Sequence, residues 1–378
     1  MYLNDVHQKN TDIEVLRAIA IIFTLFQHTA HTLLFQPNFL TDNFFTYFTY
    51  WGGVDLFFVI SGFVITRSLR QSFRINFNTK TWRIVWAFWA RRIYRIFPSA
   101  WLWLTLFTVF SYWFNSTGAF GIASVNLSDA IAAIFQYANW HAYLCNQGLS
   151  RCGPNLVYWS LSLEEQFYVL MPLVLIIFRK HLALALTVCL VPLFFLERYE
   201  WTLGWSFRFD VLIWGVLLAL FAEHSKYQLW RPQFMKLRVF RIPVITLLLL
   251  NLAYIPLYSN RIPLFTSMAG LVSLALVFIA SYDSNYILQK GWIQKIFLWI
   301  GSRSFSIYLI HIFTFRLAYE VISVFSPSDY KISTVDQPLA VVLAYSLLLI
   351  LAEISYRYIE LPFRNFGIRK AQQILQPV

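Results

Sequence analysis

The sequence predicts an all-α fold, a polytopic integral membrane bundle of about ten transmembrane helices. Hydrophobic residues make up 58% of the chain and charged residues only 13%, whereas soluble domains carry about 25% charged residues. Apolar segments long enough to cross a bilayer recur from one end to the other. The first segment is too long for the apolar region of a cleavable signal peptide. We therefore expect one transmembrane domain over residues 1–370 and a short cytoplasmic tail at 371–378.

Ten apolar segments have the length and composition of membrane spans. They centre on residues 13–35, 47–69, 96–114, 157–178, 182–198, 206–222, 242–258, 262–280, 304–325 and 338–357. An eleventh segment, Asp129–Tyr143, is short, and Gln136, Asn139 and His141 interrupt its apolar core. Its assignment decides on which side every later loop lies.

The distribution of basic residues favours ten spans over eleven. If Asp129–Tyr143 does not span, most of the 30 Lys and Arg residues lie on one side, whereas a span there divides them almost evenly. Cytoplasmic loops carry the excess of positive charge. Both termini are then expected in the cytoplasm, and residues 115–156 are expected to form a long outer loop.

The net charge of +12 has a simple explanation in this topology. Basic loops face anionic lipid headgroups, so membrane lipids are the expected partners and nucleic acid is not. Cys145 and Cys152 fall in the outer loop, where a disulfide and two free thiols both remain open. No Cys/His zinc spacing, P-loop or dinucleotide fingerprint is present, and we expect no metal.

Ionisable residues inside the first span indicate a function, because such groups are costly in hydrocarbon. Arg17 and His28 are eleven residues apart, which returns them to nearly the same helix face, roughly 16 Å apart along the axis. The alternative is an arginine that reaches the interface and a histidine that only packs.

A carboxylate in the fourth span lies at the depth of His28. Glu164 is seven residues from the outer end of its span, as His28 is from the outer end of the first. A carboxylate that orients an imidazole is the basic unit of general-base catalysis, so we predict that His28 and Glu164 pair; a purely structural ion pair is the alternative. Asp55 in the glycine-rich second span is a further candidate functional residue. A salt bridge that only stabilises the fold is the alternative interpretation.

Arginines gather near the inner end of the third predicted span. Arg92 and Arg95 are three residues apart and share a helix face, and Pro98 suits the first turn of a helix that starts nearby. Guanidinium groups before a helix N-terminus favour anion binding. With Arg17 they predict a basic pocket open to the cytoplasm. His311, seven residues from the inner end of its span, is expected at the same level.

These groups are expected at two depths in the membrane. The basic pocket lies towards the cytoplasm, and the His–carboxylate pair lies nearer the outer face. A molecule with an anionic head and a long reactive arm would reach both, and a CoA thioester has that shape.

Six motifs in this order resemble the acyltransferase-3 family of bacterial membrane acyltransferases over essentially the whole chain. They are Ile13–Ala20 followed by His28, Gly53–Phe63, Arg91–Pro98, Trp159–Tyr168, Arg208–Asp210 with Gly215, and Gly301–His311. One departure is Glu14-Val15 before Leu16-Arg17, where the family often has Asp-Gly.

The resemblance implies that an acyl group, usually acetyl, passes from cytoplasmic acetyl-CoA to a hydroxyl of a cell-envelope polysaccharide or lipid-linked sugar. It also implies a multi-pass protein of the bacterial cytoplasmic (inner) membrane. Family positions tied to activity correspond to Arg17, His28, Arg92, Arg95 and Glu164. We predict that His28 and Glu164 are the catalytic residues and that Arg17, Arg92 and Arg95 form the donor site. To this donor site we add His311, and we assign Asp55, Tyr168 and Arg208 to the path of the acceptor.

Several alternatives stay open at this point. His28 acts either as a base or as a transient acyl carrier. No extra C-terminal hydrolase-like domain is expected, which leaves room for a homo-oligomer or a periplasmic partner enzyme. A transporter or flippase of an anionic lipid-linked sugar would use the same cations without acyl transfer, although the paired halves of many transporters are not evident.

Overall fold

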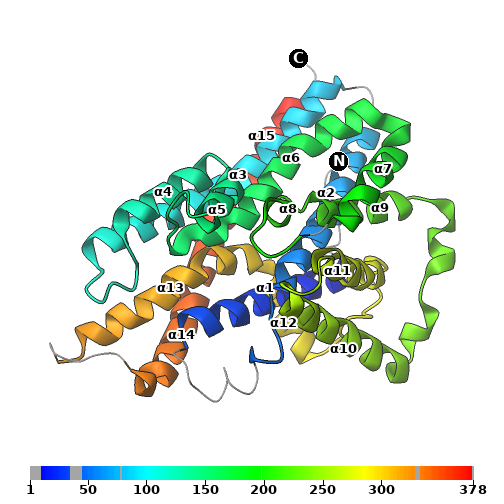
Figure 1. The fold of residues 1–378 in the computed structure, drawn as a ribbon. Helices are drawn as coiled ribbons and strands as arrows, with labels where there is room; N and C mark the ends of the chain where they lie inside the picture. Colours follow the sequence, from blue (N-terminus) through cyan, green and yellow to red (C-terminus); the bar gives the residue numbers. More distant parts are fainter. Residues whose placement is uncertain (1–9, 35–44, 77–78, 197, 328–332, 377–378) are drawn as a thin grey trace.

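The computed structural model describes residues 10–34, 45–76, 79–196, 198–327 and 333–376, and all regular elements in these ranges are helical (Figure 1). The end of the first predicted span at residue 35 and the last two residues of the expected tail lie outside the described residues. The α-helices are α1 (Thr11–Thr32), α2 (Gly52–Ile75), α3 (Thr81–Trp113), α4 (Ala123–Ile134), α5 (Ala138–Asn146), α6 (Trp159–Phe178), α7 (Leu182–Phe195), α8 (Leu203–Ser206), α9 (Phe209–Phe221), α10 (Arg238–Tyr254), α11 (Phe265–Ser281), α12 (Trp292–Ser302), α13 (Ser304–Val324), α14 (Gln337–Ser355) and α15 (Leu361–Leu375).

Each of the ten predicted spans falls on a helix, and the polytopic helical membrane fold is confirmed. Within the described residues, eight helical stretches are long and apolar enough to cross a membrane. The difference from ten has two causes. A 3₁₀ turn at Arg179–His181 joins α6 to α7, so two predicted spans form one stretch of 42 residues, and α11 has only 17 residues. The location of the termini stays a prediction.

The third span was predicted to start near Pro98, and this is wrong. Helix α3 begins at Thr81 and runs through Pro98 to Trp113. A proline inside a membrane helix is tolerated because neighbouring groups satisfy the backbone carbonyl that it leaves free. Arg92 and Arg95 therefore lie in mid-helix, and the expected contribution of a helix N-terminus to anion binding is absent.

The basic residues before Pro98 lie outside the predicted span of 96–114, yet they are helical, and α15 packs against this part of α3. Gly367 of α15 lies so close to α3 that a Cβ there would be 2.8 Å from Cβ of Tyr94. The expected tail at 371–378 is thus helical as far as Leu375.

Glycines bring α2 and α9 into direct backbone contact. A Cβ on Gly62 would lie 2.1 Å from the carbonyl oxygen of Leu212, and one on Gly215 would lie 2.2 Å from that of Val59. Small residues are favoured at helix contacts in lipid because dispersion, rather than water exclusion, drives the packing. This contact fixes α2, which supplies one wall of the site described below.

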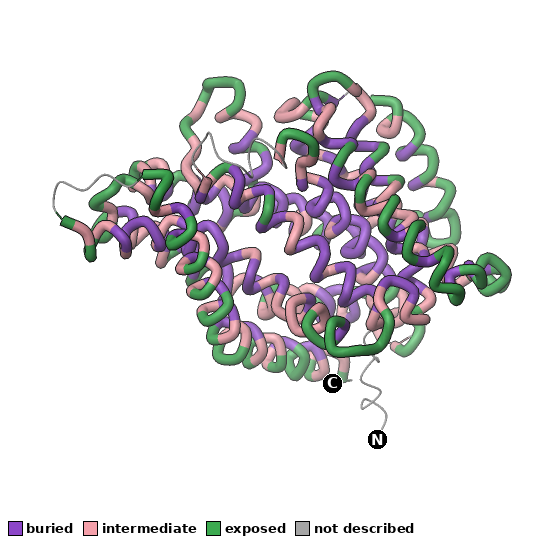
Figure 2. Tube along the Cα trace, turned by 90° about the horizontal axis from the view of Figure 1, so that it is seen from below, coloured by how far each residue is buried: buried purple, intermediate pink, exposed green. Residues whose placement is uncertain are grey.

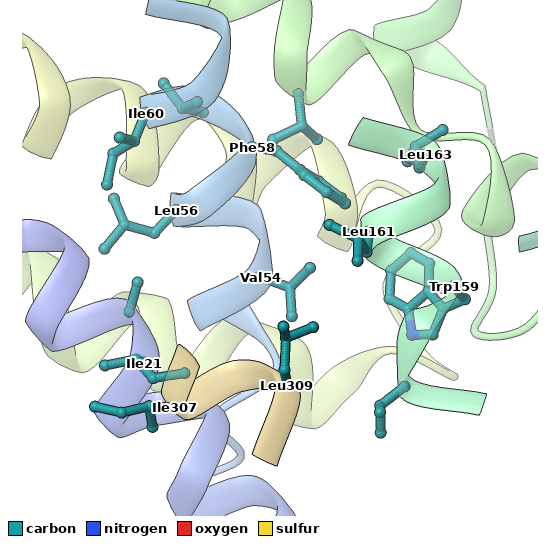
Figure 3. Close-up of a cluster of buried hydrophobic side chains, with 14 of the residues drawn as sticks. Ile21, Val54, Leu56, Phe58, Ile60, Trp159, Leu161, Leu163, Ile307 and Leu309 are labelled. Atoms are coloured by element: carbon teal, nitrogen blue, oxygen red, sulfur yellow. The ribbon is translucent and has the colours of Figure 1, made fainter. Parts of the chain in front are cut away.

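The centre of the molecule is buried and its outer helices are exposed (Figure 2). Side chains of α1, α2, α6 and α13 form the apolar core, with Val54, Phe58 and Leu161 at the meeting point of α2 and α6 (Figure 3). Large apolar side chains such as Leu184 and Val188 of α7 are exposed, as expected of a surface that faces lipid.

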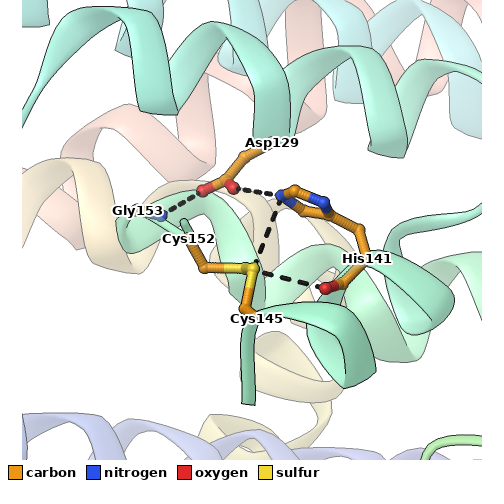
Figure 4. Close-up of a disulfide and its surroundings, with 5 residues drawn as sticks. All are labelled: Asp129, His141, Cys145, Cys152 and Gly153. Atoms are coloured by element: carbon orange, nitrogen blue, oxygen red, sulfur yellow. Dashed lines mark hydrogen bonds and ion pairs between the residues drawn. A yellow bond between two sulfur atoms is a disulfide. The ribbon is translucent and has the colours of Figure 1, made fainter. Parts of the chain in front are cut away.

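The segment Asp129–Tyr143 is not one helix. Helix α4 ends at Ile134, Gln136 has a positive φ of 60°, and α5 starts at Ala138. Cys145 and Cys152 form a disulfide beside these helices (Figure 4), which resolves the choice left open by the sequence. The predicted interruption of this segment is confirmed.

A buried polar pair ties α4 to α5 next to the disulfide. His141 Nε2 donates to Asp129 Oδ1 at 3.0 Å, and the Gly153 amide donates to Asp129 Oδ2 at 2.8 Å (Figure 4). Burial raises the pKa of the Asp129 carboxyl, and the hydrogen bond from His141 opposes this effect. The segment is therefore a folded cap with its own polar core.

Candidate active site

Five helices enclose one cavity that contains most of the predicted donor-site residues. We call it the cationic cavity; its volume is about 90 Å³, several times the space that one water needs. Its polar lining is Arg17 of α1, Ser61 of α2, Arg92 and Arg95 of α3, Ser160, Glu164 and Tyr168 of α6, and Ser304 and Tyr308 of α13. Val54, Phe58 and Leu161 supply apolar wall (Figure 3).

Glu164 is held in the wall of this cavity by two hydroxyl groups. Its Oε1 accepts hydrogen bonds from Ser61 of α2 and from Tyr168, one turn later on α6. Hydrogen bonds to a carboxylate are stronger than those between neutral groups, so its position is well defined. The neighbouring Glu165 is also buried, and its Oε1 has no hydrogen-bond partner within the described ranges.

The three predicted donor-site arginines meet here. The guanidinium of Arg92 lies 5.3 Å from the ring centre of Tyr168 and 5.6 Å from that of Phe88, a cation–π arrangement. Arg95 lines the same cavity one helical turn later. Arg17 Nη1 lies 3.4 Å from Glu14 Oε1. Three guanidinium groups and one carboxylate line the cavity, and guanidinium groups suit an anion because they donate charge-assisted hydrogen bonds.

The two membrane histidines lie next to each other. The ring centres of His28 and His311 are 5.0 Å apart, and His28 also contacts the ring of Trp51 at 6.3 Å. Neither histidine lines the cationic cavity. In the part of the chain that the structure describes, His28 and Glu164 share no hydrogen bond or ion pair, so the expected contact between them is not observed.

His311 was expected among the cations and lies elsewhere. Position along a helix gives depth but not the direction in which a side chain points, and α13 directs Tyr308 to the cavity and His311 to His28. The ring centres of Tyr308 and His311 are 5.5 Å apart. Tyr308 thus connects the histidines with the cavity.

Asp55 and Arg208 form a buried salt bridge of 2.8 Å, and each side chain is 1% exposed. The guanidinium also lies against two aromatic rings, 4.2 Å from the ring centre of Trp205 and 5.0 Å from that of Trp159. This is the structural alternative that the sequence left open for Asp55. Neither residue lines the cationic cavity, and their role in the acceptor path stays a prediction.

Sequence reasoning missed a second buried ion pair and four hydroxyl groups of the cavity. Arg198 binds Asp210 through two hydrogen bonds of 2.5 and 2.8 Å. Ser160 donates to Tyr308 Oη at 2.7 Å, because the single hydroxyl hydrogen of Tyr308 goes to the carbonyl of Val157. Four hydroxyl residues of the cavity fall inside motifs noted above, so their motif membership was the available signal: Ser61, Ser160, Ser304 and Tyr308.

His141, Cys145 and Cys152 place potential metal-ligand atoms within 4.8 Å of one another. The two sulfur atoms are joined in the disulfide and are not thiolates, which are the form that binds metals. The cluster is therefore described here as a structural one.

Fold and site together define a polytopic helical membrane protein with an arginine-lined cavity between its central helices. Residues 10–357 match the acyltransferase-3 family, described as an acyltransferase domain, and the chain belongs to this family.

Curated relatives include peptidoglycan O-acetyltransferase OatA of Listeria monocytogenes, 28% identical over 344 residues, which are 83% of this chain and 51% of the relative. A putative O-acetyltransferase of Staphylococcus aureus is 28% identical over 94% of this chain and 58% of its own length. Putative peptidoglycan O-acetyltransferase YrhL of Bacillus subtilis is 28% identical over 84% and 51%. The chain thus spans about half the length of these relatives. No solved structure matches it.

Proposed function

We propose that this protein transfers an acetyl group from cytoplasmic acetyl-CoA to a hydroxyl of a cell-wall glycan at the bacterial cytoplasmic membrane. The observation that carries this proposal is the cationic cavity, where three arginines surround a fixed carboxylate. Membership of the acyltransferase-3 family supports acyl transfer. The names of the relatives from Listeria and Bacillus support peptidoglycan as the class of acceptor.

Arg17, Arg92 and Arg95 are the proposed donor site. Guanidinium groups bind phosphate through paired, charge-assisted hydrogen bonds, and CoA carries several phosphates. The arginines would hold that end of the donor, and the apolar wall of Val54, Phe58 and Leu161 suits the uncharged acyl end.

In the reaction, His28 takes the proton from the acceptor hydroxyl, whose oxygen attacks the thioester carbonyl. The new C–O bond forms, the C–S bond breaks, and the CoA sulfur leaves with the proton from His28. Glu164 lies in the cavity wall, where its free acceptor capacity would orient the hydroxyl. The direct His28–Glu164 pair predicted from the sequence would require a rearrangement of side chains on substrate binding.

The test is acetyl transfer by the purified protein in lipid nanodiscs, with labelled acetyl-CoA and a soluble peptidoglycan fragment. We expect label in the glycan and an equal amount of free CoA thiol. His28→Ala should lower turnover by roughly 100-fold or more, the usual effect of losing a general base. Acceptor movement across the bilayer without thiol release would instead indicate a transporter and contradict the proposal.

A further inference from the structure

His311 has a defined protonation pattern in the structure. Its side chain is fully buried, and Nδ1 lies 2.6 Å from the backbone carbonyl oxygen of Tyr308. A carbonyl oxygen only accepts hydrogen bonds, so Nδ1 carries the hydrogen. In a neutral imidazole, Nε2 is then a bare acceptor. This atom is buried and has no partner within the described ranges.

An unsatisfied buried acceptor is costly, and the neighbouring ring carries a suitable donor. His28 is only partly buried, and its ring forms no hydrogen bond with any residue that the structure describes. Two imidazoles joined by an N–H···N bond of about 2.9 Å have ring centres roughly 5 Å apart. The observed separation is 5.0 Å, with an interplanar angle of 49°. The separation of the two rings therefore matches that of a hydrogen-bonded imidazole pair.

We propose that His311 is the positioning residue for His28: its Nε2 accepts the N–H of His28, so that the other ring nitrogen of His28 is free to take the acceptor proton. This inference rests on the proposed function. In a catalytic triad a carboxylate fixes the tautomer of the base and stabilises its charged form. The described structure gives no carboxylate contact for either ring, and a neutral imidazole fills that role here.

The proton balance follows from this arrangement. His28 gains one proton from the hydroxyl and returns it to the departing CoA sulfur. His311 stays neutral throughout, with Nδ1–H on the Tyr308 carbonyl and Nε2 on His28. The same Tyr308 lines the cationic cavity with its ring and donates its hydroxyl to the Val157 carbonyl at 2.5 Å. It thereby fixes His311 relative to the donor site.

A matched pair of variants separates the two nitrogens. In His311→Gln, the amide oxygen replaces the acceptor near the position of Nε2, whereas His311→Asn keeps a donor near Nδ1 and has no group at Nε2. We expect His311→Asn to lower kcat on the order of 100-fold, with the KM for acetyl-CoA unchanged within twofold. His311→Gln should stay within about tenfold of the wild type.

Non-additivity gives a second criterion, since residues that act as a unit lose their effect together. His28→Ala/His311→Asn should be no slower than His28→Ala alone. Equal losses in Gln and Asn variants, or a double variant slower by the product of both effects, would overturn the inference. Absence of transfer by the wild-type protein would overturn the proposed function itself, so the two failures are distinguishable.

Nitrogen-15 spectra of histidine-labelled protein test the pattern without replacing His311. We expect the Nδ1–H tautomer at His311 and a change in its Nε2 resonance in His28→Ala. An Nε2–H tautomer at His311 would contradict the inference. An Nε2 resonance of His311 that does not change in His28→Ala would contradict it as well.

Discussion

Two groups of charged residues inside this bundle are built in opposite ways. Asp55–Arg208 and Arg198–Asp210 are closed ion pairs, each charge facing its counter-charge at 2.5 to 2.8 Å. In the cationic cavity, Arg92 and Arg95 have no ion pair within the described residues, and Glu164 is held by hydroxyl groups instead. Charge in a membrane protein is thus not functional by location alone. A closed pair has its charge satisfied within the fold, whereas cations that form no ion pair remain available to a ligand.

We expect the largest effect when the two arginines of the cavity that form no ion pair are replaced. Arg92→Ala/Arg95→Ala removes two charge-assisted contacts to the donor, worth roughly 3–6 kcal/mol together. The KM for acetyl-CoA should rise at least 100-fold in steady-state transfer assays, with little change in thermal stability.

Arg91→Ala is the matched control for this variant. Arg91 lies beside Arg92 but donates to Ser72 Oγ at 3.2 Å and does not line the cavity. A KM that rises as much in Arg91→Ala as in the double variant would show that general basic charge, and not the cavity, attracts the donor.

Breaking a closed pair should act on stability. Arg208→Ala leaves Asp55 buried without its partner and should lower the free energy of unfolding by about 3–5 kcal/mol, measured by chemical denaturation in detergent. Replacing both charges, as in Asp55→Leu/Arg208→Met, should recover much of this loss.

The double replacement also tests the sequence-based role of these residues. With stability restored, an unchanged KM for the acceptor confines Asp55 and Arg208 to the fold. A strongly raised KM would place both residues in the acceptor path. Closed ion pairs would then share a functional role with the charged residues of the cationic cavity.

Loosening Glu164 should have a smaller effect. Tyr168→Phe removes one hydrogen bond to the carboxylate, worth roughly 1.5–3 kcal/mol, and should lower kcat/KM by about 10- to 100-fold. Tyr158→Phe is the control, since the Tyr158 hydroxyl is buried without a partner in the described structure. Equal losses in both variants would contradict a specific role for the Glu164 contact.

The smallest expected effect comes from the disulfide in the cap that α4 and α5 form. The disulfide joins residues seven positions apart, and a loop this short contributes about 2 kcal/mol by chain entropy. Cys145→Ser/Cys152→Ser should lower the unfolding midpoint modestly and leave the KM for acetyl-CoA unchanged. A large rise in that KM would link the cap to the donor site.

The sequence predicted which polar residues matter better than it predicted their contacts. Hydropathy located part of every helix that carries the site but missed the first half of α3, which carries Arg92 and Arg95. Residue spacing placed these two arginines on one face, which the cavity confirms. Counting residues from helix ends gives height alone. It could not show that His28 faces His311 while Glu164 faces Ser61, because the rotation of each helix depends on packing between distant segments.

The predicted boundary of α3 was wrong because a basic stretch of the sequence is helical. The basic stretch before Pro98 has the composition of a cytoplasmic loop, yet it is helical because α15, far along the chain, packs against it. The ion pair Arg198–Asp210 likewise joins residues whose proximity depends on the turn around α8. Such tertiary support has no local signal in the sequence.

The most direct test of this account compares acetyl-CoA with acetyl-pantetheine, which lacks the phosphates, as acyl donors for the wild-type protein and for Arg92→Ala/Arg95→Ala. We predict that the wild type prefers acetyl-CoA by at least 100-fold in kcat/KM, and that the variant loses most of this preference. An equal preference in both proteins would show that these arginines do not bind the donor phosphates.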